Sequence, residues 1–285
     1  MLTRARRLLP LPLRRVASRL LHGESPLLSS IILNWNRRAL LETTVNSYLA
    51  TVSVPYELFI IDNGSSDGSH SFISDVCAGH SNRHPVLLNE NLGGEALNPV
   101  MARARGPFIH VSENDVEFLP GWDTELLSKF EAFPNLGQLS PFSPVPRADE
   151  GEVWIEKPAE RLERNGATVM VAEGNVTTNC IVRREVWESG VRWRNIESST
   201  FRFPDDGNYS VDVKAAGFMV AWNDVYTVVN WGCHVDEYVA NLGYYIQNYA
   251  DKPWLGIEGF AARLSDHGYI LSQDETGRYS IVKNA

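Results

Sequence analysis

The sequence has few cysteines and no long apolar run. Cys77, Cys180 and Cys233 are an odd number without the spacing of a metal site, so we expect no disulfide scaffold, and the plain interpretation is a reducing cytoplasm. No stretch of the 285 residues stays apolar for long enough to form a transmembrane helix. We therefore expect a cytoplasmic protein, and an apolar fraction of 44% supplies an ordinary globular core.

Basic charge is scarce outside the N-terminus. Residues 1–22 contain six arginines and no acidic residue, which is +6, so the net charge of −9 leaves −15 for the remainder. Nonspecific binding of nucleic acid depends on cationic side chains that neutralise phosphates, so we expect no nucleic-acid partner. An acidic body does suit a metal site built from carboxylates.

The basic N-terminus also lacks the continuous apolar region of a signal peptide, because Pro10, Pro12 and several arginines interrupt it. Residues 13–21 could form a short helix with an apolar face opposite its arginines. Such a helix could rest on the inner face of a membrane. The alternatives are a frayed tail or a helix packed on the body, since nine residues make a marginal helix alone.

Two apolar strands are predicted to end in polar clusters. Leu58–Ile61 is followed by Asp62, Asn63 and Asp67, and Phe108–Val111 is followed by Glu113-Asn-Asp115. Four apolar residues without polar alternation favour a strand buried on both faces, as in a parallel sheet. Open sheets of this kind bind ligands beyond the carboxyl ends of their strands. The two clusters therefore predict a shared pocket that could hold a nucleotide beside a divalent cation.

The first half of the chain alternates strand and helix patterns, which predicts βαβ units and a parallel sheet. The second half begins with a Pro-rich and charged stretch at 141–166, which we interpret as a surface excursion or lid. A single strand is expected over 168–182, a helix over 205–217, and a helical or irregular tail after Tyr238. The expected units are a basic N-terminal segment (1–26), a nucleotide-sugar-binding half (27–142), an acceptor-binding and catalytic half (143–237) and a C-terminal extension (238–285).

Read in order, the motifs resemble a family 2 glycosyltransferase of the GT-A fold, of the soluble rhamnosyltransferase-like branch. This resemblance implies an α/β fold with a Rossmann-like, mostly parallel central sheet flanked by helices, and a smaller mixed-sheet acceptor region. The motifs that carry it are Ile31–Asn36, Ile61–Ser69, Asn91-Leu-Gly93-Gly94 leading to Asn98, Glu113–Asp115 followed by Pro120-Gly-Trp122, Asn179–Arg184, Asp205-Asp206 twelve residues before Gly217, and His234.

The resemblance implies a donor pocket at the ends of the first strands. A carboxylate such as Asp62 can accept N–H groups of a nucleobase. The alternative for Asp62 is a simple turn after a strand, and Asp67 could instead cap the following helix. The residues implied in nucleotide binding are Asn34, Asn36, Asp62, Asn63, Asp67, Asn91 and Gly93.

The resemblance also implies a site for Mn²⁺ or Mg²⁺. Glu113-Asn-Asp115 stands where the family carries its Asp-x-Asp motif, so Asp115 is the expected ligand and Glu113 replaces the usual first Asp. His234 could complete the set, since an imidazole nitrogen can bind Mn²⁺. The alternatives are a solvated acidic loop and a structural histidine.

Asp206 is the general base that the resemblance implies. In an inverting transfer, one carboxylate takes the proton of the acceptor hydroxyl. The alternative is that Asp205-Asp206 only caps the helix that follows. Asn208 and Asp212 replace an acid and an arginine that the family usually has here. Further residues implied in acceptor binding are Asp205, Asn179 and Trp122.

These expectations predict a non-processive, inverting glycosyltransferase that uses a nucleotide diphosphate-sugar, with a pyrimidine base favoured. Its acceptor would be a glycan, a lipid-linked compound or a small molecule. The Gln-x-x-Arg-Trp motif of processive synthases is absent from the sequence. A sugar nucleotidyltransferase is less compatible, because no Gly-rich phosphate loop follows the first strand. A catalytically silent member that binds a nucleotide sugar or glycan remains an alternative.

Overall fold

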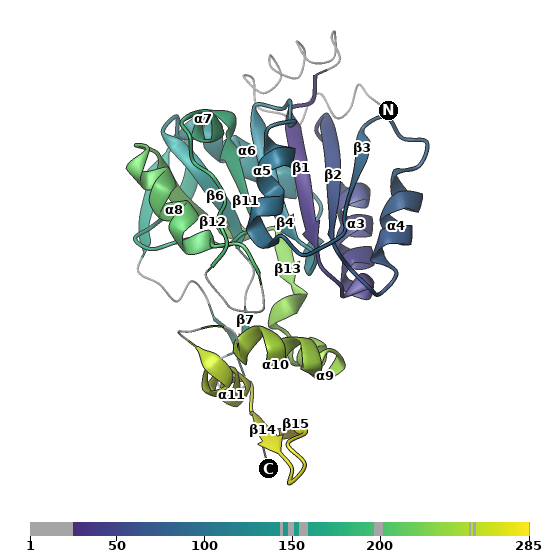
Figure 1. Ribbon diagram of the computed structural model, residues 1–285. Helices are drawn as coiled ribbons and strands as arrows, with labels where there is room; N and C mark the ends of the chain where they lie inside the picture. The colour runs from purple at the N-terminus through teal and green to yellow at the C-terminus, as the bar shows by residue number, and fades with distance from the viewer. Residues whose placement is uncertain are drawn as a thin grey trace.

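A nine-stranded mixed sheet forms the centre of the molecule, with the order β3-β2-β1-β4-β11-β6-β12-β10-β9 (Figure 1). The computed structural model describes residues 25–142, 145–147, 151–153, 159–196, 202–250, 252 and 255–284. The basic segment 1–22, for which membrane contact is expected, lies outside the described residues, as does part of the expected excursion at 141–166. None of the helices in the described ranges is long and apolar enough to cross a membrane.

The N-terminal half of the sheet is parallel, as predicted. β1 pairs in parallel with β2 and with β4, and β2 pairs with β3. Leu58, Phe59, Ile60 and Ile61 of β2 are all buried, because helices cover both faces of this strand. The elements of this half are β1 (Leu28–Asn34), α3 (Arg38–Thr51), β2 (Tyr56–Asn63), α4 (Ser69–Cys77), β3 (Arg83–Leu88), the 3₁₀ helix η1 (Gly93–Ala96), α5 (Leu97–Met101), β4 (Phe108–Glu113), β5 (Val116–Phe118) and α6 (Trp122–Ala132).

The C-terminal half adds its strands to the same sheet and makes it mixed. β11 runs antiparallel to β4 and β6, β12 runs parallel to β6, and β10 runs antiparallel to β12 and β9. The elements are β6 (Leu136–Phe142), β7 (Val145–Arg147), β8 (Gly151–Val153), β9 (Ala159–Arg164), β10 (Ala167–Ala172), β11 (Cys180–Arg183), α7 (Arg184–Glu188), α8 (Asp206–Ala215), β12 (Met219–Tyr226) and β13 (Val228–Asn230).

The single strand expected over 168–182 is wrong. Its two apolar ends belong to β10 and β11, which β12 and β6 separate in the sheet. Glu173, Gly174 and Asn175 interrupt the apolar run, and the chain leaves the sheet there. A gap of three polar or flexible residues was therefore a break between strands and not an irregularity within one.

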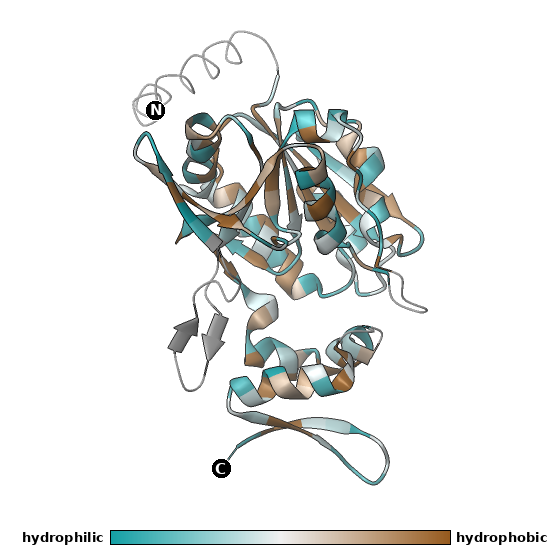
Figure 2. Cartoon of the chain, turned by 90° about the vertical axis from the view of Figure 1, so that its left-hand side faces the viewer, coloured by the Kyte–Doolittle hydropathy of each residue, from teal (hydrophilic) through white to brown (hydrophobic). Residues whose placement is uncertain are grey.

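Two apolar clusters cover the two faces of the sheet. Side chains of β1 and β2 alternate between them: Leu28 and Ile60 join α3, α4 and α6 on one face, whereas Ile31 and Ile61 join α5, α7 and α8 on the other. Figure 2 shows the apolar residues concentrated in the central strands. Each helix buries one stripe against the sheet, which is the arrangement that positions the strand ends rigidly.

A third cluster stands apart from these two, and the C-terminal helices that carry it lie beyond the strand ends in Figure 1. It is built by the segment after β13 from Tyr238, Tyr245, Tyr249, Phe260 and Leu264. The elements of this C-terminal segment are the 3₁₀ helix η2 (Trp231–Cys233), α9 (Val235–Ala240), α10 (Leu242–Ala250), α11 (Gly256–Asp266) and the hairpin of β14 (Tyr269–Gln273) and β15 (Tyr279–Lys283).

His110 makes the stability of the sheet dependent on pH. Burial lowers the pKa of this histidine from 6.5 to about 4, although a hydrogen bond with Asn179 opposes the shift. The unfolded chain therefore binds the proton first, and stability is lost as pH falls from 6.5 toward 4, by about 3 kcal/mol at most. Urea unfolding of wild type and of the His110→Gln variant at pH 7.0 and 4.5 measures this effect, because the variant lacks the titrating imidazole.

The stability difference between wild type and His110→Gln should therefore shrink in acid. The exposed His80 provides the control, as His80→Gln removes a histidine that contacts no core cluster. A difference between wild type and His110→Gln that is equal at the two pH values would contradict the prediction.

Candidate functional site

A pocket opens at the carboxyl ends of the central strands. Residues from both halves of the sheet and from the C-terminal segment line it. Five of the residues proposed from sequence face it: Asn63, Asn91, Gly93, Glu113 and Asp206. The pocket therefore brings a residue expected at the nucleotide, a residue expected at the metal and the expected base to one place. Its remaining walls include Trp35, Arg37, Asn114, Tyr244, Asn248 and Lys252.

Asn63 fixes the nucleotide side of the pocket. Its side-chain amide donates to Asn91 Oδ1 (2.8 Å) and to the Gly93 carbonyl (3.2 Å), and its Oδ1 accepts from the Leu92 N–H (2.9 Å). Gly93 has φ +60°, and a Cβ at that position would collide with the Asn195 side chain. The loop after β3 is thus held against the end of β2, and glycine is required for its close approach.

Four other predicted nucleotide residues support the strand ends and do not line this pocket. Asn34 is fully buried and accepts from Asn114 Nδ2 at 2.6 Å. The buried Asp62 accepts from the Ser65 N–H at 3.1 Å, while its other oxygen lies 3.6 Å from His70 Nδ1. Asn36 and Asp67 line a neighbouring pocket instead.

The hydrogen bonds of Asp67 reach the starts of two helices, although the N-cap residue of α4 is Gly68 and not Asp67. Its carboxylate accepts from the N–H and the hydroxyl of Ser69, at the start of α4, and from the Arg38 N–H at the start of α3. Burial opposes ionisation, yet these hydrogen bonds lower the pKa of Asp67. The side chain therefore joins the first turns of two helices.

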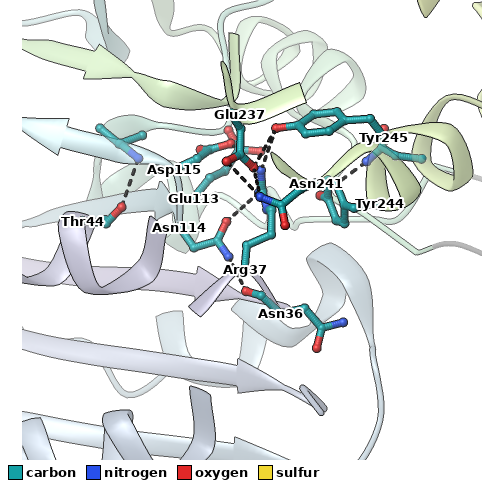
Figure 3. Close-up of polar contacts among 12 residues, drawn as sticks. Asn36, Arg37, Thr44, Glu113, Asn114, Asp115, Glu237, Asn241, Tyr244 and Tyr245 are labelled. Atoms are coloured by element: carbon teal, nitrogen blue, oxygen red, sulfur yellow. Dashed lines mark hydrogen bonds and ion pairs between the residues drawn. The ribbon is translucent and has the colours of Figure 1, made fainter. Parts of the chain in front are cut away.

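Arg37 lies at the centre of the acidic side of the pocket (Figure 3). Its guanidinium donates to Asp115 Oδ2 (3.1 Å), to Asn114 Oδ1 (2.6 Å) and to the Tyr245 hydroxyl (3.2 Å). It also stacks 4.5 Å from the ring centroid of Tyr244. Burial works against its charge, but the surrounding tyrosines and acids, Asp115 among them, raise the pKa of Arg37.

Glu113 has no comparable partner among the described residues, since no hydrogen bond reaches its carboxylate. Burial and the negative charges of Asp115 and Asp206 raise its pKa to about 8, and the charges of Arg37 and Lys252 oppose this. Asp115 Oδ1 is also buried without a hydrogen-bond partner. An acid that ionises reluctantly and a buried acceptor without a donor are the features that a bound cation would satisfy.

His234 does not line this pocket, and its expected role at the metal stays a prediction. Its ring packs on Trp231 with centroids 4.8 Å apart, and it precedes the first turn of α9. Within the described ranges, no three His, Cys, Asp or Glu side chains come together as a metal cluster. A cation here would therefore take only one or two carboxylates from the protein, and ligand oxygens would supply the rest.

Asp205 and Asp206 have different roles in the structure. Asp205 is the N-cap of α8: its carboxylate accepts from the N–H (2.9 Å) and the side-chain amide (2.5 Å) of Asn208. Asp206 is the first residue of the helix and faces the pocket, where Asn175 Nδ2 approaches it at 3.4 Å. The capping alternative therefore applies to Asp205, and the side chain expected to act as the base is directed into the pocket.

Two predicted acceptor residues are core residues instead. Trp122 is fully buried and packs on Tyr48, Phe118 and His110. Asn179 is buried as well, and its Oδ1 lies 3.0 Å from His110 Nε2. Neither side chain can contact an acceptor in this structure, because each is used to join strands and helices beneath the pocket.

The C-terminal segment supplies pocket residues that sequence reasoning missed. Tyr244, Asn248 and Lys252 are spaced by four and line the same wall. The Lys252 ammonium lies 5.3 Å from the ring centroid of Phe203 and 4.9 Å from that of Tyr249. Burial lowers the pKa of Lys252, while the charges of Glu113 and Asp206 raise it. Tyr244 and Asn248 lie one turn apart on α10, so their spacing of four was a readable signal of one helix face, whereas Lys252 lies beyond the end of that helix.

Comparison with known proteins assigns this arrangement to a family. The profile of Glycosyl transferase family 2 matches residues 29–191, more than half of the chain. An uncharacterized glycosyltransferase of Nostoc sp. is 25% identical over 178 residues, which cover 59% of this chain and 55% of that protein. A putative teichuronic acid biosynthesis glycosyltransferase of Bacillus subtilis is 30% identical over 105 residues, which cover 36% of this chain and 40% of that protein. The chain thus spans about half, or less, of the length of these relatives.

Two solved structures have a similar fold. A mannosyltransferase from Pyrobaculum calidifontis, in complex with GDP-mannose and Mn²⁺, has a TM-score of 0.56 and 19% identity, covering 93% of this chain and 72% of its own. GalNAc-T7 with UDP, GalNAc and Mn²⁺ has a TM-score of 0.55 and 12% identity, covering 72% of this chain and 43% of its own. These likenesses confirm the GT-A type of α/β fold. The relatives named here give no support to a rhamnosyltransferase branch.

Proposed function

The chain belongs to glycosyl transferase family 2, and on that basis we propose that it transfers a single sugar from a nucleotide diphosphate-sugar to an acceptor hydroxyl, with inversion and with Asp206 as the general base. One observation carries the proposal. Asp206 faces the same pocket as Glu113 and Asn63, while its neighbour Asp205 caps the helix. On this proposal, a bound donor exposes its anomeric carbon to the pocket within reach of the Asp206 carboxylate.

The reaction needs one proton acceptor and one leaving group. Asp206 takes the proton of the acceptor hydroxyl, and the oxygen forms its new bond to the anomeric carbon. The bond from that carbon to the diphosphate breaks, and its electron pair leaves with the nucleoside diphosphate. Attack from the face opposite the leaving group inverts the configuration, so a second catalytic carboxylate is not required.

The residues present fit a divalent cation, Mn²⁺ or Mg²⁺, held by Asp115 through its buried Oδ1 and by Glu113. When bound, such a cation neutralises charge that develops on the leaving diphosphate. In both solved neighbours Mn²⁺ accompanies the nucleotide. Asn63 and Asn91 would bind the nucleoside, and the acceptor would enter on the side of Asp206.

Thermal unfolding with a panel of nucleoside diphosphates tests this function. We expect UDP, dTDP or GDP to raise the melting temperature in the presence of Mn²⁺, because a ligand at a hundredfold excess over its dissociation constant stabilises the folded state by about 2.7 kcal/mol. The pyrimidine nucleotides are favoured, and GDP is included because one structural neighbour binds GDP-mannose. The matching nucleosides without phosphate are the controls. Absence of any shift with every diphosphate would contradict the proposal.

The structure weakens one reason for the catalytically silent alternative. Asn208 and Asp212 depart from the family pattern, but Asn208 completes the cap of Asp205, and Asp212 forms an ion pair with Arg194. Neither lines the pocket. These departures from the family pattern therefore leave Asp206, Glu113 and Asp115 in place. An active transferase remains the better-supported function.

A further inference from the structure

The strongest unexplained feature of the molecule is the position of Arg37. It lies three residues beyond the end of β1, immediately before α3, and its side chain is only 9% exposed. Asn36 and Arg37 both have φ +55°, a left-handed conformation that is uncommon for side chains other than glycine. The Asn36 backbone is held in place by the Ser65 hydroxyl and by Asn114 Nδ2. The chain thus accepts an unfavourable backbone conformation that directs Arg37 across the strand ends.

Two polar atoms at this place have no hydrogen-bond partner among the residues that the structure describes. Arg37 Nε is a buried donor without an acceptor, and Asp115 Oδ1 is a buried acceptor without a donor. The two residues nevertheless form an ion pair through their other atoms at 3.1 Å. An anion would satisfy Arg37 Nε, and a cation would satisfy Asp115 Oδ1. Each member of the ion pair therefore has one unsatisfied polar atom, and the two atoms require ligands of opposite charge.

The ion pair and a cation at Asp115 oppose each other. A divalent ion bound to this carboxylate would lie beside the guanidinium, and like charges at such a distance repel strongly where water is scarce. The repulsion is removed when an anion lies between the two charges. Arg37 also offers a planar fork of donors that suits phosphate oxygens.

Resting on the proposed function, we propose that Arg37 exchanges partners during donor binding. In the absence of donor it pairs with Asp115 and excludes a lone cation. When a nucleoside diphosphate arrives with its cation, the cation takes Asp115 and the guanidinium turns to the diphosphate. Arg37 is therefore a positioning residue for the donor, and it makes binding of the cation dependent on binding of the diphosphate.

Opposite changes in two affinities test this exchange. In Arg37→Met, the affinity for Mn²⁺ alone should rise about tenfold, because the competing charge is gone. The affinity for the nucleoside diphosphate at saturating Mn²⁺ should fall about tenfold, as expected for one lost charge-assisted hydrogen bond, while the nucleoside affinity stays constant. Both constants can be measured by calorimetry on the full chain, without any assay of activity.

Arg38→Met is the matched control. It removes the same charge from the next residue, whose side chain is 46% exposed and pairs with Glu42. Neither affinity should change in this variant. A fall in both affinities of Arg37→Met, or no change in either, would overturn the exchange and leave Arg37 a structural residue.

Arg37→Lys keeps the proposal testable if the methionine variant does not fold. The ammonium retains the competing charge but lacks the fork, so the diphosphate affinity should fall while the Mn²⁺ affinity stays at the wild-type value. An unchanged diphosphate affinity would overturn the proposal. If wild type itself binds no diphosphate, the proposed function fails; if wild type binds it and the variants bind it equally, only the role of Arg37 fails.

Discussion

Replacement of Asp206 by Asn should lower the turnover number by about 10²- to 10⁴-fold, the usual contribution of a general base. Asparagine keeps the shape of the side chain but cannot accept the proton of the acceptor hydroxyl. The affinity for the nucleoside diphosphate should stay near that of wild type. Donor contacts are expected from Asn63 and Asn91, and from a cation held by Glu113 and Asp115. Steady-state kinetics with the donor that the melting panel identifies, together with calorimetry, separates the two effects.

Asp205→Asn is the control for this experiment. Asparagine is nearly as good an N-cap as aspartate, so the helix and the turnover should be preserved. Equal losses in the two variants would show that Asp205 and Asp206 act only in starting α8. A loss confined to Asp206→Asn, with donor binding intact, would also exclude a silent binding protein.

Asp115→Asn should abolish the dependence of nucleotide stabilisation on Mn²⁺ and lower the stability of the metal-free protein. Arg37 is buried against this carboxylate, and loss of one partner of a buried ion pair costs about 3–5 kcal/mol. The metal-dependent gain, about 2.7 kcal/mol at a hundredfold excess of ligand, should disappear as well. Denaturant unfolding with and without Mn²⁺ and nucleotide measures both quantities.

Glu113→Gln makes the appropriate comparison for Asp115→Asn. Its pKa is raised by burial and by the neighbouring acids, so its ionised form opposes folding. Loss of this charge should therefore leave the metal-free stability unchanged or higher above pH 5, in contrast to Asp115→Asn. Equal destabilisation by both substitutions would show that the ion pair between Asp115 and Arg37 adds nothing specific to the free energy of unfolding.

The parallel half of the fold was predictable because its sequence pattern is strong. Unbroken apolar runs such as Leu58–Ile61 end abruptly in polar residues, and this pattern fixes both the strands and the edge of the sheet where the pocket lies. The mixed half was not predictable in the same way. Its strands pair with neighbours far away in the sequence, as β6 does with β12, and no local pattern specifies such partners.

A site residue was hard to predict where its residue type could serve either the pocket or the fold, by capping a helix or packing in the core. Asp205 and Asp206 are equivalent in the sequence, and only the start of α8 decides which one caps the helix. Trp122 and Asn179 sit in motifs of the family but serve the core, since a motif residue can be retained for packing. Arg37 gave no signal, because its role depends on a backbone conformation that the sequence does not announce.

The tyrosine-rich cluster after β13 has a consequence for how the molecule opens. Its core of Tyr238, Tyr245, Tyr249, Phe260 and Leu264 is separate from the two clusters on the sheet. Near the pocket it meets the strand ends through Arg37, mainly by hydrogen bonds and ring contacts. Local opening of this unit therefore leaves both sheet clusters covered, and its amide hydrogens can exchange with solvent without global unfolding. We therefore expect this wall of the pocket to open as a unit of its own, and a bound ligand to stabilise its closed position.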